Sequence, residues 1–153
     1  MTSSISIDSS VFLSGLTTTD PSFAVSKAFL KKIVTGNILI IVPVLVLFEV
    51  LHAYFRNTKD LKKTDEVFQN FIDLNIEKKI RFVNIEADFL SYFVARHYEI
   101  DLKTLDSVIA LVAQKNHCPL VTWDKKLLKN CKGKIQTMTP AEFLRKRTIP
   151  IYK

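Results

Sequence analysis

The chain has 153 residues, 48% of them hydrophobic, and a formal charge of +7 with a pI near 9.4. This apolar content excludes a disordered chain, and the length suits one domain with a sizeable core, which we expect over residues 1–153 because no linker or repeat divides it. The positive charge favours an anionic partner such as RNA or DNA, although many intracellular proteins are rich in lysine without binding nucleic acid.

The segment at residues 38–55 is apolar enough to be compared with a membrane span. Its unbroken apolar run covers only Ile38 to Phe48, whereas a span needs about 20 residues. The segment also contains Pro43, Glu49 and His52. A buried strand followed by a buried helix explains it better, so we expect no contact with a membrane.

The two cysteines, Cys118 and Cys131, do not have the spacing of a metal or redox motif. No secretory signal precedes the first predicted strand. We therefore expect free thiols in a cytoplasmic protein.

Strand and helix patterns alternate along the chain. Strands are predicted at residues 5–7, 38–42, 80–85, 119–122 and 135–137. Helices are predicted from about residue 9, and at residues 23–35, 43–56, 67–74, 87–97, 105–115, 125–128 and from 139, where Thr139 and Glu142 form a capping-box pattern. We expect Thr104 to cap the helix at 105–115 and residues 56–63 to form a loop. The alternation predicts a mostly parallel sheet with helices on both faces.

Four acids occupy informative places in this pattern. Asp8 and Asp124 each follow a predicted strand, Asp106 lies in the first turn of a predicted helix, and Glu49 lies in the apolar run VLVLFEVL. A parallel sheet could bring all four to the edge where ligands bind, beyond the carboxyl ends of its strands. Two unit charges about 4 Å apart repel by about 4 kcal/mol at an effective dielectric constant of about 20. Such a cluster therefore indicates a hard divalent cation.

Each acid also has an ordinary structural explanation. Asp8 and Asp124 could cap helices, and Asp106 could interact with the dipole of its helix. Glu49 could pair with a lysine or arginine, or face solvent. It is the hardest to explain in this way, because a buried carboxylate is costly unless it is paired, hydrogen-bonded or bound to a metal.

Polar residues next to these acids are further candidates. The hydroxyl groups of Ser9 and Thr122 stand beside Asp8 and Asp124, where they either orient a carboxylate or water or only cap a helix. Lys125 and Lys126 directly follow Asp124 and could contact a phosphate.

Four segments resemble motifs of the PIN domain, and in particular of the small VapC-type ribonuclease toxins. They are ISIDSSVF at residues 5–12, PVLVLFEV at 43–50, TLDSVIALVA at 104–113 and PLVTWD at 119–124. The resemblance extends from about Ser4 to Leu144. It implies a three-layer α/β/α sandwich with a mostly parallel sheet of about five strands.

The resemblance also implies a function, namely a metal-dependent endoribonuclease that hydrolyses phosphodiester bonds of RNA with Mg²⁺ or Mn²⁺. Asp8 and Asp106 would be the principal metal ligands, and the other two acids would complete the catalytic cluster. Ser9 and Thr122 would support it. VapC-type toxins pair with a cognate antitoxin and often form homodimers. Three alternatives stay open: a non-catalytic RNA-binding or scaffold module of this fold, a solitary PIN nuclease in RNA processing, and an unrelated α/β protein whose acids are only caps.

Overall fold

The computed structural model describes residues 3–146, apart from the side chain of Tyr98. Its sheet has five parallel strands in the order β3-β2-β1-β4-β5, which confirms the expected α/β class. The strands are β1 (Ser3–Ile7), β2 (Ile38–Pro43), β3 (Ile80–Val83), β4 (Leu120–Val121) and β5 (Thr137–Met138).

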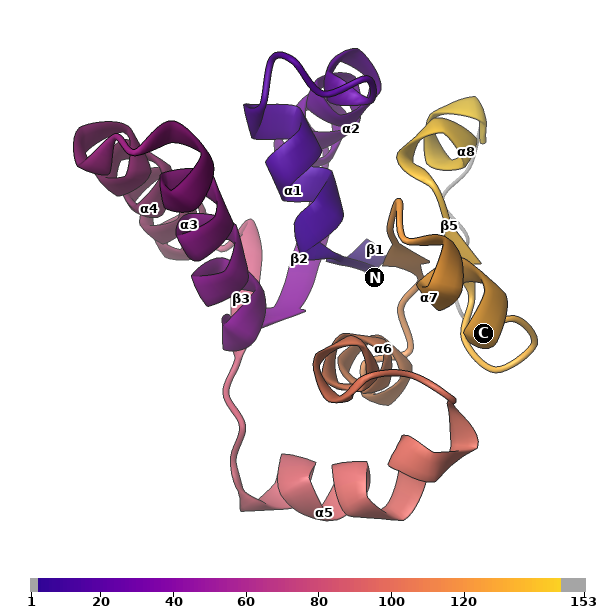
Figure 1. Ribbon diagram of the computed structural model, residues 1–153. Coiled ribbons are helices and arrows are strands. Elements are labelled where there is room, and N and C mark those ends of the chain that lie inside the picture. Colours follow the sequence, from indigo (N-terminus) through magenta and orange to yellow (C-terminus); the bar gives the residue numbers. More distant parts are fainter. Residues whose placement is uncertain (1–2, 147–153) are drawn as a thin grey trace.

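Eight α-helices and a short 3₁₀ helix are described between and after these strands (Figure 1). They are α1 (Ser9–Leu16), α2 (Phe23–Thr35), α3 (Val44–Thr58), α4 (Leu61–Ile76), α5 (Ala87–Arg96), η1 (His97–Glu99), α6 (Thr104–Lys115), α7 (Lys125–Asn130) and α8 (Pro140–Arg145).

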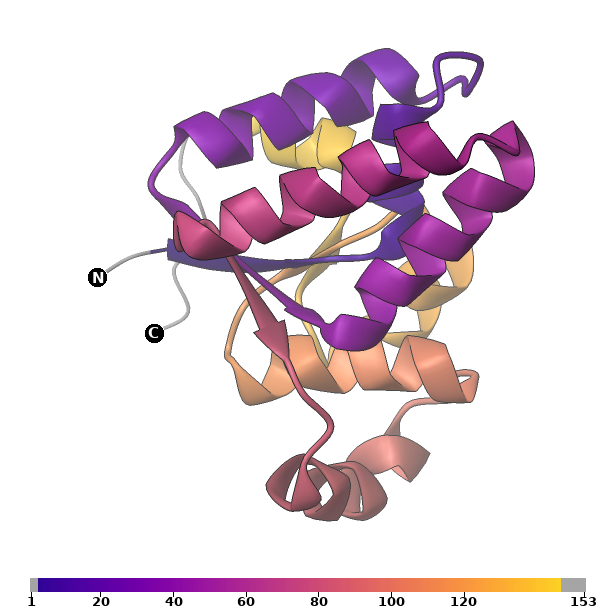
Figure 2. The same cartoon turned by 90° about the vertical axis from the view of Figure 1, so that its left-hand side faces the viewer.

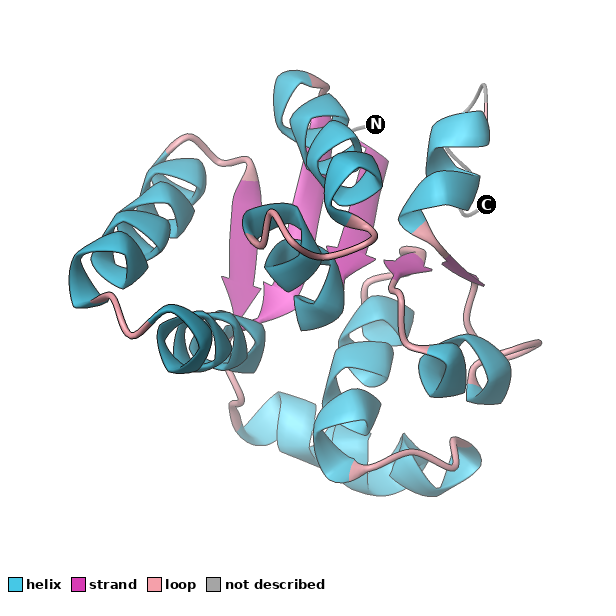
Figure 3. Ribbon diagram, turned by 45° about the horizontal axis from the view of Figure 1, so that its top comes forward, coloured by secondary structure: helices cyan, strands magenta, loops and turns pink. Residues whose placement is uncertain are grey.

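The sheet lies between two layers of helices. Figure 2 shows α2, α4 and α8 on one side of the strands and α6 on the other, with α5 beyond α6. Figure 3 shows the strands side by side, with the short strands β4 and β5 next to β1. Because both faces are covered, central strands such as β2 consist of apolar, mostly β-branched residues, and nearly all of β2 is buried.

The hydrophobic core follows from this layering. Strands β1 and β2 contribute buried isoleucines, while α6 buries an unbroken run from Ser107 to Ala113 against them. On the opposite face, Phe29 of α2 packs edge-on against Phe143 of α8 at 5.1 Å between ring centroids.

The chain reverses its winding direction at β1. Elements β2 and β3 lie to one side of β1 and β4 and β5 lie to the other, so β1 and β4 are neighbours although about 115 residues separate them. The backbone N–H of Asp8 donates to the carbonyl of Val121 at 3.0 Å, which continues this pairing beyond the end of β1. Ligands of parallel sheets bind at such a reversal, outside the carboxyl ends of the strands.

Three expectations from the sequence are wrong. Residues 56–63 are mostly helical, because α3 continues to Thr58 and α4 begins at Leu61, where Asp60 caps the new helix through the N–H of Lys63. Thr104 is the first residue of α6 and not its cap; Lys103 holds the cap position without a side-chain hydrogen bond. The third concerns α3, which is not buried all round: Phe48 is 59% exposed, since only one face of this helix packs against α1 and α4.

The capping box at the start of α8 is confirmed. The hydroxyl of Thr139 accepts from the N–H of Glu142, and the carboxylate of Glu142 accepts from the N–H of Thr139. No helix of residues 3–146 has the length and apolarity needed to cross a membrane.

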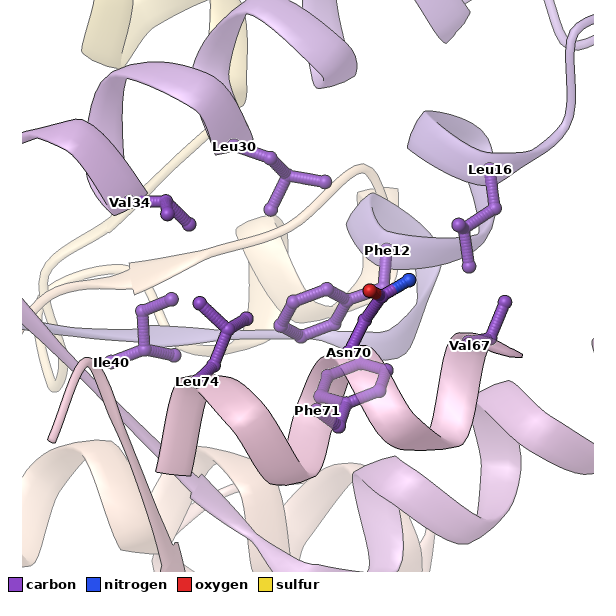
Figure 4. A pocket seen from close by; sticks show the side chains of 9 residues that line it. All are labelled: Phe12, Leu16, Leu30, Val34, Ile40, Val67, Asn70, Phe71 and Leu74. Atoms are coloured by element: carbon purple, nitrogen blue, oxygen red, sulfur yellow. The ribbon is translucent and has the colours of Figure 1, made fainter. Parts of the chain in front are cut away.

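An apolar pocket of about 130 Å³ lies between α1, α2, α4 and β2 (Figure 4). Asn70 is the one polar residue among those that line it; the others are Phe12, Leu16, Leu30, Val34, Ile40, Val67, Phe71 and Leu74. The pocket contains none of the four acids, so the candidate chemistry lies elsewhere in the fold.

The two cysteines are buried, free thiols. Burial raises the pKa of Cys118 to about 12 and that of Cys131 to about 11, from an ordinary value of 9.0. We predict that neither thiol reacts with Ellman's reagent at pH 8 in the native protein and that both react after unfolding in urea. Rapid labelling of the native protein would contradict the burial.

The same pKa shifts have a consequence for stability. Because the pKa values of the thiols are raised in the folded state, folding favours the neutral thiol. The contribution of the neutral thiols to the free energy of unfolding is complete below pH 9 and is lost as the pH rises towards 11 and 12. Replacing both cysteines by alanine should therefore lessen the fall in unfolding free energy across that window, relative to the wild type. Urea titrations at pH 8 and pH 10.5 measure the difference.

Candidate active site

The carboxylate of Asp8 is held by hydroxyl groups at the end of β1. It is 5% exposed and occupies the cap position of α1, yet its side chain makes no capping hydrogen bond. Its Oδ2 atom instead accepts from the hydroxyl of Ser10 at 2.6 Å and from the hydroxyl of Thr122 at 2.8 Å. The helix-cap explanation of Asp8 is therefore wrong, and the side chain faces the β4 side of the sheet reversal.

Thr122 links Asp8 to Asp124. Its hydroxyl donates to Asp8 and accepts from the backbone N–H of Asp124 at 2.9 Å, while its own N–H donates to the carbonyl of Met138 on β5. The residue is completely buried. Thr122 is therefore in direct contact with the acids that follow both strands.

Asp124 has a capping role as well as a place in the cluster. Its Oδ1 atom accepts from the N–H groups of Lys126 and Leu127, at 2.6 and 3.1 Å, and so begins α7. Here the ordinary explanation from the sequence is confirmed. It does not exclude a second role, because Asp124 also raises the pKa of Asp106 and so lies within electrostatic range of it.

Asp106 comes from α6, which covers the face of the sheet opposite to α2, α4 and α8. Burial raises its pKa, and the charges of Asp124 and Asp8 raise it further. Lys103 and Lys126 oppose this shift. The dipole of α6 is thus only part of the electrostatic surroundings of Asp106, because the charges of two other carboxylates also act on it.

Glu49 completes the group from α3. Partial burial raises its pKa first, and the charges of Asp8 and Asp106 add to the shift, while a hydrogen bond from Ser9 opposes it. Glu49 is half-buried, not fully buried as its apolar helix suggested, because α3 exposes one face. Ser9 also approaches Oδ1 of Asp8 at 3.4 Å, so it stands between two of the acids.

Asp106 is therefore within electrostatic range of Asp8, Asp124 and Glu49, and Glu49 is also within range of Asp8. Their carboxylate oxygens are the donors that hard divalent cations prefer, so the donor chemistry fits Mg²⁺ or Mn²⁺. In the described part of the chain, however, no group of three or more His, Cys, Asp and Glu side chains is arranged to hold an ion as it stands.

The two lysines that the sequence places near a phosphate differ in their positions relative to Asp106. The charge of Lys126 lowers the pKa of Asp106, and Lys126 lines a pocket together with Asp106. Lys125 is the first residue of α7 and is exposed, and it is not among the residues lining that pocket.

Sequence reasoning missed Ser10 and Lys103. Ser10 makes the shortest contact to Asp8 and accepts from the N–H of Trp123 at 3.2 Å. The sequence feature that could have indicated Ser10 is a second hydroxyl residue, two positions after the acid at the end of the strand. Lys103 directly precedes the first turn of α6, but its approach to Asp106 depends on the path of the preceding loop, which no local pattern encodes.

The hydroxyl of Thr122 should contribute to stability as well as to positioning. In Thr122→Val the Oδ2 of Asp8 is deprived of a donor and the N–H of Asp124 of its acceptor. We predict that the free energy of unfolding falls by about 1–3 kcal/mol. Urea unfolding in EDTA measures it, and Thr122→Ser, which keeps the hydroxyl, is the matched control. Thr122→Ser should stay closer to the wild type. Because Thr122→Val keeps the γ-methyl group, an unchanged free energy of unfolding in Thr122→Val would contradict a contribution from the hydrogen bonds.

Comparisons with solved structures give the same fold. A toxin–antitoxin complex from Klebsiella pneumoniae aligns with a TM-score of 0.60 at 20% identity, covering 89% of this chain and 97% of that one. VapBC2 from Rickettsia felis, bound to a DNA fragment from its promoter, aligns with a TM-score of 0.66 at 14% identity, covering 89% of this chain and 98% of that one. VapC20 from Mycobacterium tuberculosis, a toxin that cleaves the sarcin–ricin loop, aligns with a TM-score of 0.59 at 15% identity, covering 81% of this chain and 92% of that one.

A comparison with curated proteins gives no match. The family model of the PIN domain matches residues 5–133, which include all four acids, β4 and the last three residues of β1. This match covers most of the chain and agrees with the resemblance of the four sequence motifs. The chain is therefore a member of the PIN domain family, with the fold of VapC toxins.

Proposed function

We propose that this protein is a metal-dependent endoribonuclease that hydrolyses phosphodiester bonds of RNA, and that it is the toxin of a toxin–antitoxin pair. The observation that carries the proposal is the placement of Asp8. Its carboxylate occupies a helix-cap position but is held by hydroxyl groups towards three other acids. Membership of the PIN family, whose nucleases generally use divalent metals, supports the same conclusion.

The four acids would hold the metal, with Asp8 and Asp106 as the principal ligands and Glu49 and Asp124 completing the set. A bound Mg²⁺ or Mn²⁺ would supply a water of lowered pKa and would offset charge that develops on the phosphate oxygens. Ser10 and Thr122 fix the orientation of the Asp8 carboxylate, and Ser9 separates it from Glu49. No protein nucleophile is needed.

The charge distribution suits an RNA substrate. The protein carries +7 overall, yet the reacting centre is acidic. Basic surface attracts the phosphate backbone, while the acids accept the scissile phosphate only when a cation is present. Lys126 beside Asp106 and Lys125 at the start of α7 are the proposed first contacts of that backbone.

Cleavage of RNA tests the activity. Purified protein with Mn²⁺ should cleave RNA, and EDTA should abolish the reaction. Asp8→Asn and Asp106→Asn should each lower the rate by more than about 100-fold, since even the partners of metal ligands typically contribute 10- to 100-fold. Gel analysis of labelled RNA measures the rate.

Asp73→Asn is the matched control, because Asp73 is an exposed acid on α4 that lies outside the acid cluster and does not line the pocket beside Asp106. It should leave the rate nearly unchanged. Equal cleavage by wild type and Asp8→Asn would attribute the reaction to a contaminating nuclease. RNA binding without metal-dependent cleavage would favour the non-catalytic binding module.

Induced expression tests the assignment as a toxin. Wild-type protein should arrest growth, Asp8→Asn should not, and co-expression of a small protein encoded next to this chain should relieve the arrest and copurify with the toxin. Solved structures that share this fold include toxin–antitoxin complexes, which motivates the partner. Normal growth together with metal-dependent cleavage in vitro would favour a solitary nuclease in RNA processing. A homodimer is a separate proposal that sedimentation can test.

A further inference from the structure

A second pocket opens beside the acid cluster. It has a volume of about 480 Å³, and its walls come from the segment that leads into α6 and from α7, which are neighbours in Figure 3. The residues that line it are Asp101, Leu102, Lys103, Asp106, Lys126, Lys129 and Asn130.

Three lysines line this pocket and give it positive charge. Lys126 and Lys129 are three residues apart on α7 and so share one face of the helix, while Lys103 stands on the other wall. Three ion pairs within 4.0 Å are found among residues 3–146, and none of them includes these lysines; they are Lys63–Asp60, Arg96–Glu99 and Lys115–Asp88. The acids in the pocket wall therefore do not hold the ammonium groups in direct contacts.

The pocket is continuous with the proposed site of hydrolysis. Asp106 belongs to both, and Lys103 and Lys126 line the pocket together with it. An anion in the pocket would therefore lie next to the phosphate that the acids act on.

Hydrogen bonds connect the two walls of the pocket. The amide of Asn130, at the end of α7, donates to the carbonyl of Asp101, and the ammonium of Lys134 donates to the carbonyl of Glu99. At its other end α7 is held by Asp124 through the N–H of Lys126. The lysine positions are thus set by the backbone on both sides, not by flexible loops alone.

We infer that this pocket binds a backbone phosphate of the RNA adjacent to the scissile one, an inference that rests on the proposed function. Ammonium groups bind phosphates as point charges. The lining includes no aromatic side chain on which a base could stack, so the contact is to the backbone and not to a base. Contacts of this kind position the strand without selecting its sequence.

Lys129 is the decisive residue. It lines the pocket from the last turn of α7, one turn beyond Lys126. Lys129→Gln removes a positive charge from the pocket and changes none of the proposed metal ligands. Lys62→Gln on α4, also an exposed lysine, is the matched control, and Lys129→Arg keeps the charge.

The experiment measures binding of a short single-stranded RNA by fluorescence anisotropy in EDTA, at several salt concentrations. Lys129→Gln should weaken binding equally for RNAs of different sequence and reduce the slope of log affinity against log salt by about 0.7 for each phosphate that is no longer neutralised. Lys129→Arg and Lys62→Gln should keep the wild-type slope. With Mn²⁺, Lys129→Gln should raise KM more than it lowers kcat.

An unchanged slope in Lys129→Gln, or an equal change in Lys62→Gln, would overturn the inference, as would RNA binding by the wild type that does not depend on salt. This outcome is distinct from failure of the proposed function. If the wild type cleaves RNA but Lys129→Gln behaves like Lys62→Gln, only the phosphate pocket is wrong. If the slope changes but the wild type does not cleave, the pocket binds RNA in a non-catalytic module.

Discussion

The meeting of β1 and β4 at the reversal of the sheet is the constraint on which the rest of the site depends. It makes neighbours of two segments about 115 residues apart, and the hydrogen bond from Asp8 to Val121 fixes their alignment. Every strand of a parallel sheet presents its carboxyl end at the same edge, so the residues that follow β1 and β4 must share a small space. Two acids stand there, and α3 and α6 add one each. Their repulsion is therefore a consequence of topology.

This repulsion explains the polar surroundings of the acids. Neutral hydroxyl groups hold Asp8, a serine separates it from Glu49, and two lysines act on Asp106. None of these partners neutralises an acid through a close ion pair among the described residues. The repulsion among the acids is therefore not offset by a direct ion pair, and the divalent cation of the proposed function would offset it.

Much of the fold was predictable because its signals are local. The β-branched run at residues 38–42, the capping box of Thr139 and the strand-end positions of Asp8 and Asp124 all depend on neighbouring residues. The two-residue link between α3 and α4 was missed, because the polar sequence of residues 56–63 is equally compatible with an exposed helix face and with a loop. The exposure of Phe48 was missed for another reason: hydrophobicity alone does not show how many faces of a helix find a partner.

Asp8 and Asp124 show why position is not sufficient to assign a role. Both occupy the residue before a helix, and a sequence pattern treats them alike. Asp124 gives one oxygen to the N–H groups of α7, so that oxygen is committed to the backbone. Asp8 gives none to the N–H groups of α1, and its donors are hydroxyl groups, which can rotate and act as acceptors when a cation replaces their hydrogen bonds. In the proposed function Asp8 would therefore exchange its present partners for a metal without giving up a backbone hydrogen bond of its side chain, whereas Asp124 would bind with only one oxygen and would keep α7, with Lys126 and Lys129, in place.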